Sequence, residues 1–190
     1  ILHGDLLDAD ALIVRSKTKI NRDLLEDTPV QFVGTATAGT DHIDAAWLES
    51  KGIYWCASPG CNANSVSEYL IAALLVLGRR HGFDLNGKTI GVVGCGNVGS
   101  RVARKCEALG MNVLRNDPPL SAVSTDTDFF PLETVLAESD IVTLHVPLVK
   151  EGPWPTVRMA DYRFFEQLKP GAVFINAARG SVCDYDALLD

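Results

Sequence analysis

A glycine-rich turn limits the possible folds of this chain more than any other feature. Residues Thr89–Val93 form a largely apolar run, and Gly94-x-Gly96-x-x-Gly99 follows it directly, before a stretch with helical periodicity. In such a unit the first glycine permits a tight bend, the second lets the backbone approach phosphates, and the third lets the helix pack closely on the strand. The N–H groups and the dipole at the start of the helix favour an anion. The segment therefore predicts a dinucleotide-binding site.

An acidic residue at the expected distance indicates which dinucleotide binds. Residues 113–114 read as a second parallel strand, and Asp117 stands at its carboxyl end. A carboxylate about 20 residues beyond the glycines accepts hydrogen bonds from ribose hydroxyls and repels a 2′-phosphate. NAD is therefore favoured over NADP, and Asn97 and Val98 are expected to offer N–H groups to the pyrophosphate. The less favoured alternative is that Asp117 only begins the turn Asp-Pro-Pro.

Composition favours a cytoplasmic enzyme domain with a small-molecule ligand. The net charge of −7 and the lack of a basic cluster argue against nucleic acid as the main partner. The longest apolar run, residues 70–78, is too short to cross a bilayer, and no signal-peptide pattern is present, so no membrane partner is expected. The five cysteines have no CxxC spacing, which favours reduced thiols and gives no indication of a metal site.

The order of the expected elements indicates two lobes, residues 1–63 for substrate and 64–190 for nucleotide. Strands and helices alternate in the first lobe, as in a parallel sheet. Its strands are expected at 11–15, 30–34 and 53–57, and its helices at 21–25 and 43–51. The second lobe is expected to begin with a helix from Asn64 or Ser65 to about residue 77, with Ser65 and Glu68 as a capping box. This segment is apolar on nearly every side, which predicts burial between the lobes.

Polar segments follow each expected strand of the second lobe. The strands are expected at 89–93, 113–114, 140–147 and 170–176, and a helix at 97–109. The last two strands are continuous apolar runs, typical of parallel strands that are covered on both faces. Ligands of such sheets bind beyond the carboxyl ends of the strands. The residues expected at that rim are Gly94, Asp117, 145–147 and 176–180.

The glycine turn, His145-Val-Pro-Leu148 and Phe174-Ile-Asn-Ala-Ala-Arg-Gly-Ser-Val-Cys-Asp184 together resemble the D-isomer-specific 2-hydroxyacid dehydrogenases. The resemblance implies an α/β fold, with a Rossmann-like doubly wound parallel sheet and part of a flavodoxin-like substrate lobe. It assigns catalysis to Arg179, whose planar guanidinium can hold a carboxylate and the neighbouring oxygen. It also implies contacts with NAD from Val146, Ala177, Ala178 and Arg179. Val146 stands where the family often has threonine.

Further segments narrow the resemblance to one branch of the family. These are Phe32-Val-Gly-Thr-Ala-Thr-Ala-Gly-Thr-Asp-His42, Ser58-Pro-Gly-Cys-Asn-Ala63, Asp117-Pro-Pro119 and Gly152-Pro153. The branch implies the oxidation of 4-phospho-D-erythronate to 2-oxo-3-hydroxy-4-phosphobutanoate in pyridoxal 5′-phosphate (vitamin B6) biosynthesis. By position, Ser16 and Thr37 match its substrate-binding residues, and a homodimer is expected. A sister dehydrogenase acting on 3-phosphoglycerate, a non-catalytic NAD-sensing module and a fragment without any ligand are the alternatives.

The family's catalytic histidine and glutamate have no match among the 190 residues. In the family they follow the segment that contains Arg179, and none of His3, His42, His81 and His145 matches. His145 is expected to be structural or to line the nicotinamide pocket. The chain also lacks an initial methionine and begins a few residues before an expected strand. We therefore expect an internal fragment of a longer enzyme, without turnover by itself.

Overall fold

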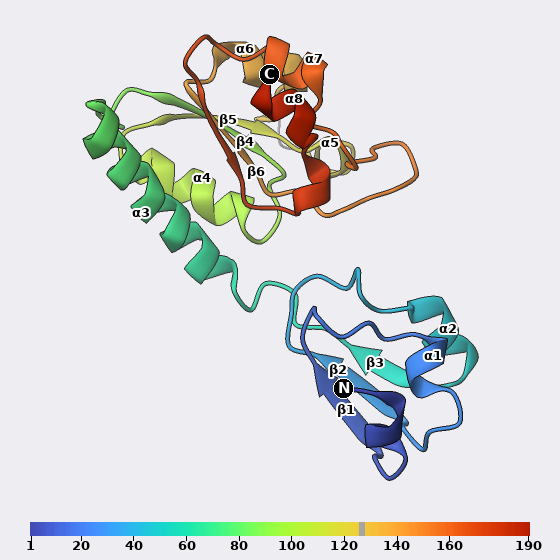
Figure 1. Ribbon diagram of the computed structural model, residues 1–190. Coiled ribbons are helices and arrows are strands. Elements are labelled where there is room, and N and C mark those ends of the chain that lie inside the picture. Colours follow the sequence, from blue (N-terminus) through green and yellow to red (C-terminus); the bar gives the residue numbers. More distant parts are fainter. Residues whose placement is uncertain (126–127) are drawn as a thin grey trace. The chain divides into compact units, whose positions relative to one another are not determined.

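The computed structural model describes residues 1–125 and 128–190 of the chain. These residues form two compact units, Ile1–Asn62 and Ala63–Asp190, each with its own hydrophobic core (Figure 1). Each unit is built on a sheet in which every strand pair is parallel, with helices in the connections. The α/β class expected from the sequence is therefore confirmed.

The first unit contains a three-stranded sheet in the order β1–β2–β3. The strands span Ala11–Val14 (β1), Phe32–Thr35 (β2) and Tyr54–Cys56 (β3). The 3-10 turn η1 (His3–Leu6) and the helices α1 (Arg22–Leu25) and α2 (Ala45–Ser50) are short. Asn21 and Asp44 cap the two helices by accepting hydrogen bonds from backbone N–H groups. The core consists of Leu6, Leu12, Val14, Ile20, Leu25, Val30, Val33 and Leu48.

The first unit buries only one face of its sheet. Successive side chains in a strand point to opposite faces, and Leu12 and Val33 are buried on the core side. On the other face Ile13 and Tyr54 are 66% and 69% exposed. The Tyr54 ring stacks on Phe32 there, with ring centroids 5.9 Å apart. The exposed face is therefore apolar.

The second unit contains a four-stranded sheet in the order β5–β4–β6–β7. The strands span Thr89–Val93 (β4), Asn112–Asn116 (β5), Ile141–Leu144 (β6) and Val173–Asn176 (β7). The helices are α3 (Ala63–His81), α4 (Gly99–Ala108), α5 (Pro118–Ser121), α6 (Leu132–Glu138), α7 (Tyr162–Glu166) and α8 (Tyr185–Leu189), and a 3-10 turn, η2, spans Gly180–Val182.

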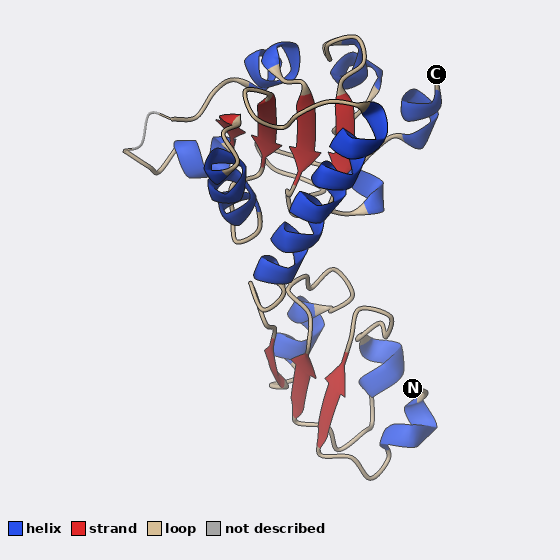
Figure 2. Ribbon diagram, turned by 90° about the vertical axis from the view of Figure 1, so that its left-hand side faces the viewer, coloured by secondary structure: helices blue, strands red, loops and turns tan. Residues whose placement is uncertain are grey.

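Helices cover both faces of the second sheet (Figure 2). On one face, Leu74 of α3 and Val102 of α4 pack in a cluster with Ile90 of β4. On the other face, Leu136 of α6 and Phe164 of α7 pack with residues of β4 and β6. This is the doubly wound arrangement that the sequence predicts. The edge strand β7 differs from the expectation, because its residues are only partly buried.

The long helix α3 differs from the expectation in two respects. It begins at Ala63 and continues to His81, so Ser65 lies inside the helix and is not its N-terminal cap. Its buried residues form a single stripe, namely Ala63, Ser67, Leu70, Leu74 and Gly78. Tyr69 and Val76 lie outside the stripe and are 78% and 63% exposed. The spacing of three or four residues in the stripe is that of one helix face. The sequence did not reveal this face, because apolar residues also occur on the other sides of the helix.

No helix in the described ranges has both the length and the apolar content needed to cross a membrane.

The turn between β4 and α4 depends on close approach between backbone atoms. Gly94 has φ of +88°, and a Cβ there would lie 2.8 Å from the carbonyl carbon of His145. A Cβ on Gly99 would lie 1.8 Å from the carbonyl oxygen of Gly94. A Cβ on Gly96 would meet nothing within 4 Å. The first and third glycines are therefore required by the fold, and the second faces open space.

Replacing Gly99 with alanine is expected to destabilise the second unit by about 2 kcal/mol or more, because a backbone atom must move to admit the Cβ. Gly96→Ala is the matched control and is expected to change the free energy of unfolding by less than about 1 kcal/mol. Urea unfolding of the two variants measures the difference. Equal stability of both variants would contradict the close packing of α4 on the turn.

Candidate functional site

The strand register of the second unit places four polar segments at one edge of the sheet. Val93 pairs with Asn116 and with Leu144, and Leu144 pairs with Asn176. The residues that follow these positions therefore leave the sheet on the same side. They are Gly94, Asp117, His145 and Ala177, which begin the four segments that the sequence predicts at the ligand rim.

The turn after β4 fits a phosphate group. Gly96 presents no side chain and borders open space. The N–H groups of Asn97 and Val98 have no hydrogen-bond partner in the part of the chain that the structure describes. They precede the first turn of α4, which begins at Gly99 with Val98 as its N-terminal cap. Unpaired N–H groups at a helix start attract anions, so these residues suit the pyrophosphate of a dinucleotide.

Asp117 has a structural role in addition to the predicted one. One carboxylate oxygen accepts a hydrogen bond from the N–H of Cys95 at 2.7 Å, and the other accepts one from the N–H of Leu120 at 3.0 Å. Asp117 therefore joins the end of β5 to the glycine turn and caps α5. A carboxylate has about four acceptor positions, so further positions remain for ribose hydroxyls. Binding of ribose by Asp117 stays a prediction.

Cys95 lies inside the glycine turn and is buried. Burial, together with the nearby Asp117 carboxylate, raises the pKa of the Cys95 thiol to about 11. The sulfur also lies 3.7 Å from the carbonyl oxygen of Val92. The side chain is therefore a neutral thiol near pH 7 and fills the turn as a small apolar group.

The loop that carries Arg179 is held by a side chain at the end of β7. The Asn176 amide oxygen accepts a hydrogen bond from the N–H of Ala178 at 3.0 Å, and its amide nitrogen donates one to the carbonyl of Arg179 at 3.0 Å. The N–H of Ala177 donates to the carbonyl of Leu144 at 3.1 Å. Arg179 itself is exposed. The loop thus presents a guanidinium on a fixed backbone at the edge of the sheet where the sequence predicts a ligand.

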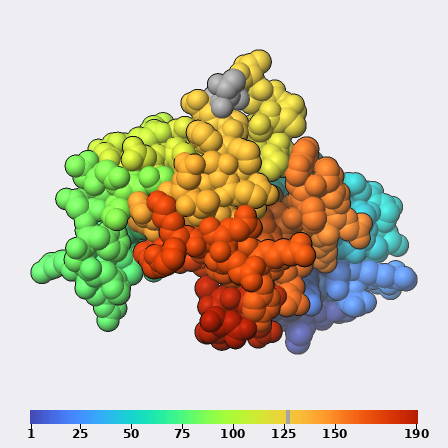
Figure 3. Space-filling model, turned by 90° about the horizontal axis from the view of Figure 1, so that it is seen from above, coloured from blue at the N-terminus to red at the C-terminus, as the bar shows by residue number. Residues whose placement is uncertain are grey.

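An ion pair between Arg158 and Asp184 holds the segment that follows the Arg179 loop, and the sequence did not indicate it. The Arg158 guanidinium donates from Nε to Asp184 at 3.1 Å, and its terminal nitrogen contacts the same oxygen. Arg158 has φ of +51°, which side-chain-bearing residues rarely adopt, and its N–H donates to the carbonyl of Ser181. Figure 3 shows the orange and red atoms of this part of the second unit in contact. Arg158 carried no sequence signal, because its partner is 26 residues away.

The first unit brings Ser16 and Thr37 to the carboxyl ends of adjacent strands. Val14 of β1 pairs with Thr35 of β2, and each predicted residue follows two positions later. Ser16 is exposed and Thr37 is half-buried. Thr37 Oγ1 lies 2.7 Å from Thr35 Oγ1, and Thr35 Oγ1 lies 3.0 Å from Nε2 of His42. Sequence reasoning missed Thr35, and for His42 it established only that the residue does not match the family's catalytic histidine.

His145 begins the segment after β6 and is mostly buried. Its Nε2 lies 3.1 Å from Thr143 Oγ1, and its backbone N–H donates to the carbonyl of Val93 at 2.7 Å. Burial lowers the pKa of His145 to about 4. The ring is therefore neutral at pH 7 and a weak base. Val146 next to it is partly buried and packs against the core on the α6 side of the sheet.

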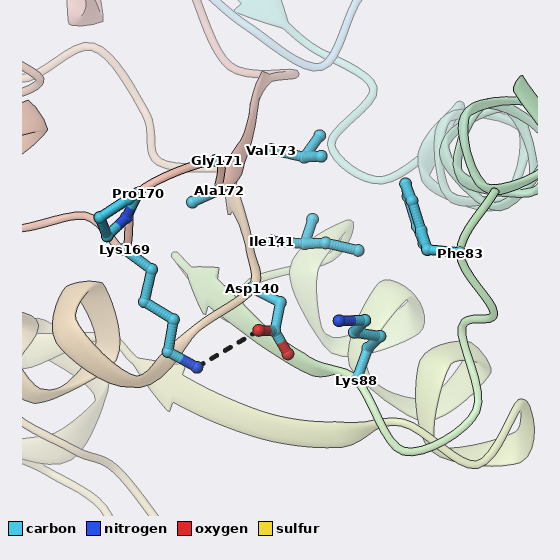
Figure 4. A pocket seen from close by; sticks show the side chains of 9 residues that line it. All are labelled: Phe83, Lys88, Asp140, Ile141, Lys169, Pro170, Gly171, Ala172 and Val173. Atoms are coloured by element: carbon cyan, nitrogen blue, oxygen red, sulfur yellow. Dashed lines mark hydrogen bonds and ion pairs between the residues drawn. The ribbon is translucent and has the colours of Figure 1, made fainter. Parts of the chain in front are cut away.

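A separate cavity of about 180 Å³ lies at the opposite ends of the strands (Figure 4). Asp140, at its wall, accepts hydrogen bonds from the N–H of Thr89 at 2.9 Å and from Lys169 at 3.3 Å. These donors, Thr89 above all, lower the pKa of Asp140. The carboxylate thus ties β4 and β7 segments together at the amino ends. Ligands of doubly wound sheets bind at the carboxyl ends, so this cavity is not the cofactor site.

Residues 76–190 match the family model described as "D-isomer specific 2-hydroxyacid dehydrogenase, NAD binding domain". This match covers more than half of the chain. The chain belongs to the D-isomer specific 2-hydroxyacid dehydrogenase family. Both the family and NAD, as the cofactor of its nucleotide-binding domain, are confirmed as the sequence predicts.

Relatives of this family resemble the chain over nearly its whole length. An erythronate-4-phosphate dehydrogenase of Salmonella typhi is 54% identical over 185 residues, which are 97% of this chain and 49% of the relative. The proteins of the same description from Salmonella gallinarum and Salmonella agona match equally. The chain thus spans about half the length of the curated relatives it matches.

Two solved members of the family share the fold. D-lactate dehydrogenase from Aquifex aeolicus, in complex with NAD and lactic acid, has a TM-score of 0.84 and 32% identity, and the match covers 99% of this chain and 62% of that one. The NAD-bound 3-phosphoglycerate dehydrogenase from Entamoeba histolytica has a TM-score of 0.84 and 31% identity, with the same coverage.

The depressed pKa of His145 predicts a pH-dependent stability for this family member. The folded-state pKa of about 4 lies below the ordinary 6.5, so the unfolded state binds the proton first as pH falls. The contribution of the His145 ring to the free energy of unfolding is complete above pH 6.5. It is lost as pH falls towards 4, and the total loss is about 3 kcal/mol.

Urea unfolding between pH 7 and pH 4.5 measures this loss. His145→Asn is expected to unfold with a flatter pH dependence than the unchanged chain. His81→Asn, which removes an exposed histidine from the end of α3, is the control and is expected to keep the original slope. Equal slopes for all three proteins would show that the buried ring is not the cause.

Proposed function

We propose that this chain is part of an NAD-dependent enzyme that oxidises 4-phospho-D-erythronate to 2-oxo-3-hydroxy-4-phosphobutanoate in pyridoxal 5′-phosphate biosynthesis. The observation that carries the proposal is the 54% identity to erythronate-4-phosphate dehydrogenase across 97% of the chain. The matched 185 residues extend through both units of the chain. The relatives solved with lactic acid or named for 3-phosphoglycerate are only 32% and 31% identical.

Arg179 is proposed to bind the substrate carboxylate. Its backbone is fixed by the Asn176 side chain, while its side chain is exposed at the rim. A guanidinium presents parallel N–H donors, so it can hold the carboxylate and polarise the oxygen on carbon 2 together. That polarisation stabilises the developing carbonyl as hydride leaves carbon 2.

The residues of the second unit are proposed to hold the cofactor around that point. Gly94, Gly96, Gly99, Asn97 and Val98 would hold the pyrophosphate, and Asp117 the adenosine ribose. Val146, Ala177, Ala178 and Arg179 would line the nicotinamide end. When bound, NAD supplies the acceptor for the hydride that leaves carbon 2.

The proton of the substrate hydroxyl needs a base as well. His145 is a poor candidate because its pKa of about 4 leaves it a weak base at pH 7. His42 is bound to Thr35 in the first unit. The histidine and glutamate that the family resemblance implies are not among the 190 residues. Residues Ser16 and Thr37 are proposed to position the substrate.

We further propose a cytoplasmic homodimer that does not bind nucleic acid or membranes. All five cysteines are free thiols, as is usual in a reducing compartment. The net charge of −7 opposes association with nucleic acid. The exposed Tyr69 and Val76 of α3 supply apolar surface for a subunit contact.

Steady-state kinetics on the full-length protein tests the reaction. With NAD, 4-phospho-D-erythronate is expected to give a higher kcat/KM than 3-phosphoglycerate, followed by NADH absorbance. Arg179→Gln is expected to lower kcat/KM by about 10²–10³-fold, because it removes charge stabilisation in the transition state, and to leave NADH affinity within a few-fold.

Arg163→Gln is the control, since it removes an exposed arginine that belongs to α7 and not to the loop, and it is expected to keep the original rate. Preference for 3-phosphoglycerate would overturn the proposed substrate. Full activity of Arg179→Gln would overturn the role of the arginine, and NADH binding without any turnover would indicate an NAD-sensing module.

A further inference from the structure

Three side chains at the end of β2 form a continuous hydrogen-bonded chain. Thr37 Oγ1 donates to the carbonyl of Gly39 at 2.9 Å. Thr37 Oγ1 also lies 2.7 Å from Thr35 Oγ1, which in turn lies 3.0 Å from Nε2 of His42. Thr35 and His42 are buried, with 3% and 9% of their surfaces exposed. This series of hydrogen bonds therefore leads from the buried His42 ring to the half-buried Thr37.

Counting hydrogens along this chain assigns the direction of each bond. A threonine hydroxyl has one hydrogen, and a carbonyl has none, so the hydrogen of Thr37 lies on the bond to Gly39. Thr35 must then donate to Thr37. Since that uses the only hydrogen of Thr35, His42 must donate to Thr35 from Nε2. In this arrangement His42 carries a hydrogen on Nε2, and its buried Nδ1 has no hydrogen-bond partner among the described residues.

The reverse direction leads to the same result for Thr37. In that arrangement Thr37 donates to Thr35, Thr35 donates to His42, and the carbonyl of Gly39 loses its hydrogen. In both directions the single hydrogen of Thr37 is used within the protein. What Thr37 Oγ1 offers to a ligand is a lone pair, which repels the acceptor oxygens of a carboxylate or phosphate and attracts a hydroxyl.

The backbone around this chain is anchored on both sides. The carbonyl of Thr37 accepts a hydrogen bond from the N–H of Ser58 at 3.0 Å. The carbonyl of His42 accepts a hydrogen bond from the N–H of Ile20 at 2.8 Å, and the backbone N–H of Asp44 donates one to the carbonyl of Ile20. Turning the Thr37 hydroxyl towards an anion would break its bond to Gly39 without relaxing these anchors. The acceptor orientation is thus preorganised.

We propose that Thr37 accepts a hydrogen bond from the 3-hydroxyl of the substrate, and that this contact selects 2-hydroxy acids with a second hydroxyl beside the reacting carbon. The inference rests on the proposed function, in which Thr37 contacts 4-phospho-D-erythronate. That substrate carries a hydroxyl on carbon 3, whereas 3-phosphoglycerate carries only the hydroxyl that reacts. Thr37 is the specificity-determining residue, and Thr35 and His42 are positioning residues that act through it.

The test compares two substrates with the full-length enzyme and NAD. One is 4-phospho-D-erythronate, and the other is its 3-deoxy analogue, (R)-2-hydroxy-4-phosphobutanoate. The unchanged enzyme is expected to show a kcat/KM about tenfold lower for the analogue, the size of one hydrogen bond. Thr37→Val is expected to lose about tenfold on 4-phospho-D-erythronate and to stay within about twofold on the analogue.

Further variants separate this role from a structural one. Thr37→Ser keeps the hydroxyl and is expected to keep the discrimination between the substrates. Thr35→Val removes the hydroxyl that holds Thr37 Oγ1, so the lone pair of Thr37 loses its fixed direction. The ratio of kcat/KM for 4-phospho-D-erythronate to kcat/KM for the analogue is expected to fall, whereas simple destabilisation would lower both kcat/KM values equally. Thr28→Val is the matched control, because it removes a threonine hydroxyl that donates only to Leu25 in the same unit; it is expected to leave the ratio unchanged.

Equal use of the two substrates by the unchanged enzyme would overturn the inference while leaving the proposed function standing. An equal loss on both substrates in Thr37→Val would do the same. If Thr37→Val does not fold, as judged by thermal melting, Thr37→Ala replaces it in the comparison. Absence of turnover of 4-phospho-D-erythronate by the unchanged enzyme would overturn the proposed function, and the inference with it.

Discussion

The carbonyl oxygen of Gly94 occupies the space that a side chain on residue 99 would need. Because Gly99 has no side chain, the first residue of α4 can pack directly against the turn that follows β4. This packing also leaves the N–H groups of Asn97 and Val98 at the carboxyl edge of the sheet, where the next three strands end in polar segments. The proposed cofactor rim of the second unit therefore depends on one backbone contact that only glycine permits.

Side chains at strand ends hold the remaining residues that are proposed to contact ligands. Asn176 closes the Arg179 loop with two hydrogen bonds, and Asp117 joins β5 to the glycine turn. In the first unit, Thr35 and His42 hold the Thr37 hydroxyl. In each case a short polar side chain uses its hydrogen-bonding capacity on neighbouring groups. A ligand can therefore bind only to the hydrogen-bond donors and acceptors that are not already paired within the protein. Preorganised sites select their partners in this way.

The sequence predicts those parts of the fold that depend on local chemistry. Glycine spacing located the turn after β4, and alternation of apolar runs predicted both parallel sheets. The helix expected at 21–25 agrees with α1 to within one residue. The partly exposed face of α3 was not predictable, because apolar content does not say which sides find a partner. The Arg158–Asp184 pair and the direction of the Thr37 hydroxyl were not predictable either, since both depend on distances that only the folded backbone sets. The individual contacts of Ser16, Thr37, Asp117 and Val146 with ligands remain predictions.

Titration of NADH into the chain and into its Gly96→Ala variant tests the central claim most directly. A Cβ on Gly96 touches nothing in the protein, so it should interfere only with a phosphate that lies against the turn. The account predicts saturable binding by the unchanged chain and an affinity at least about tenfold lower in the variant, with the same thermal melting. Undiminished binding by Gly96→Ala, or no saturable binding by the unchanged chain, would contradict the assignment of this turn to the pyrophosphate.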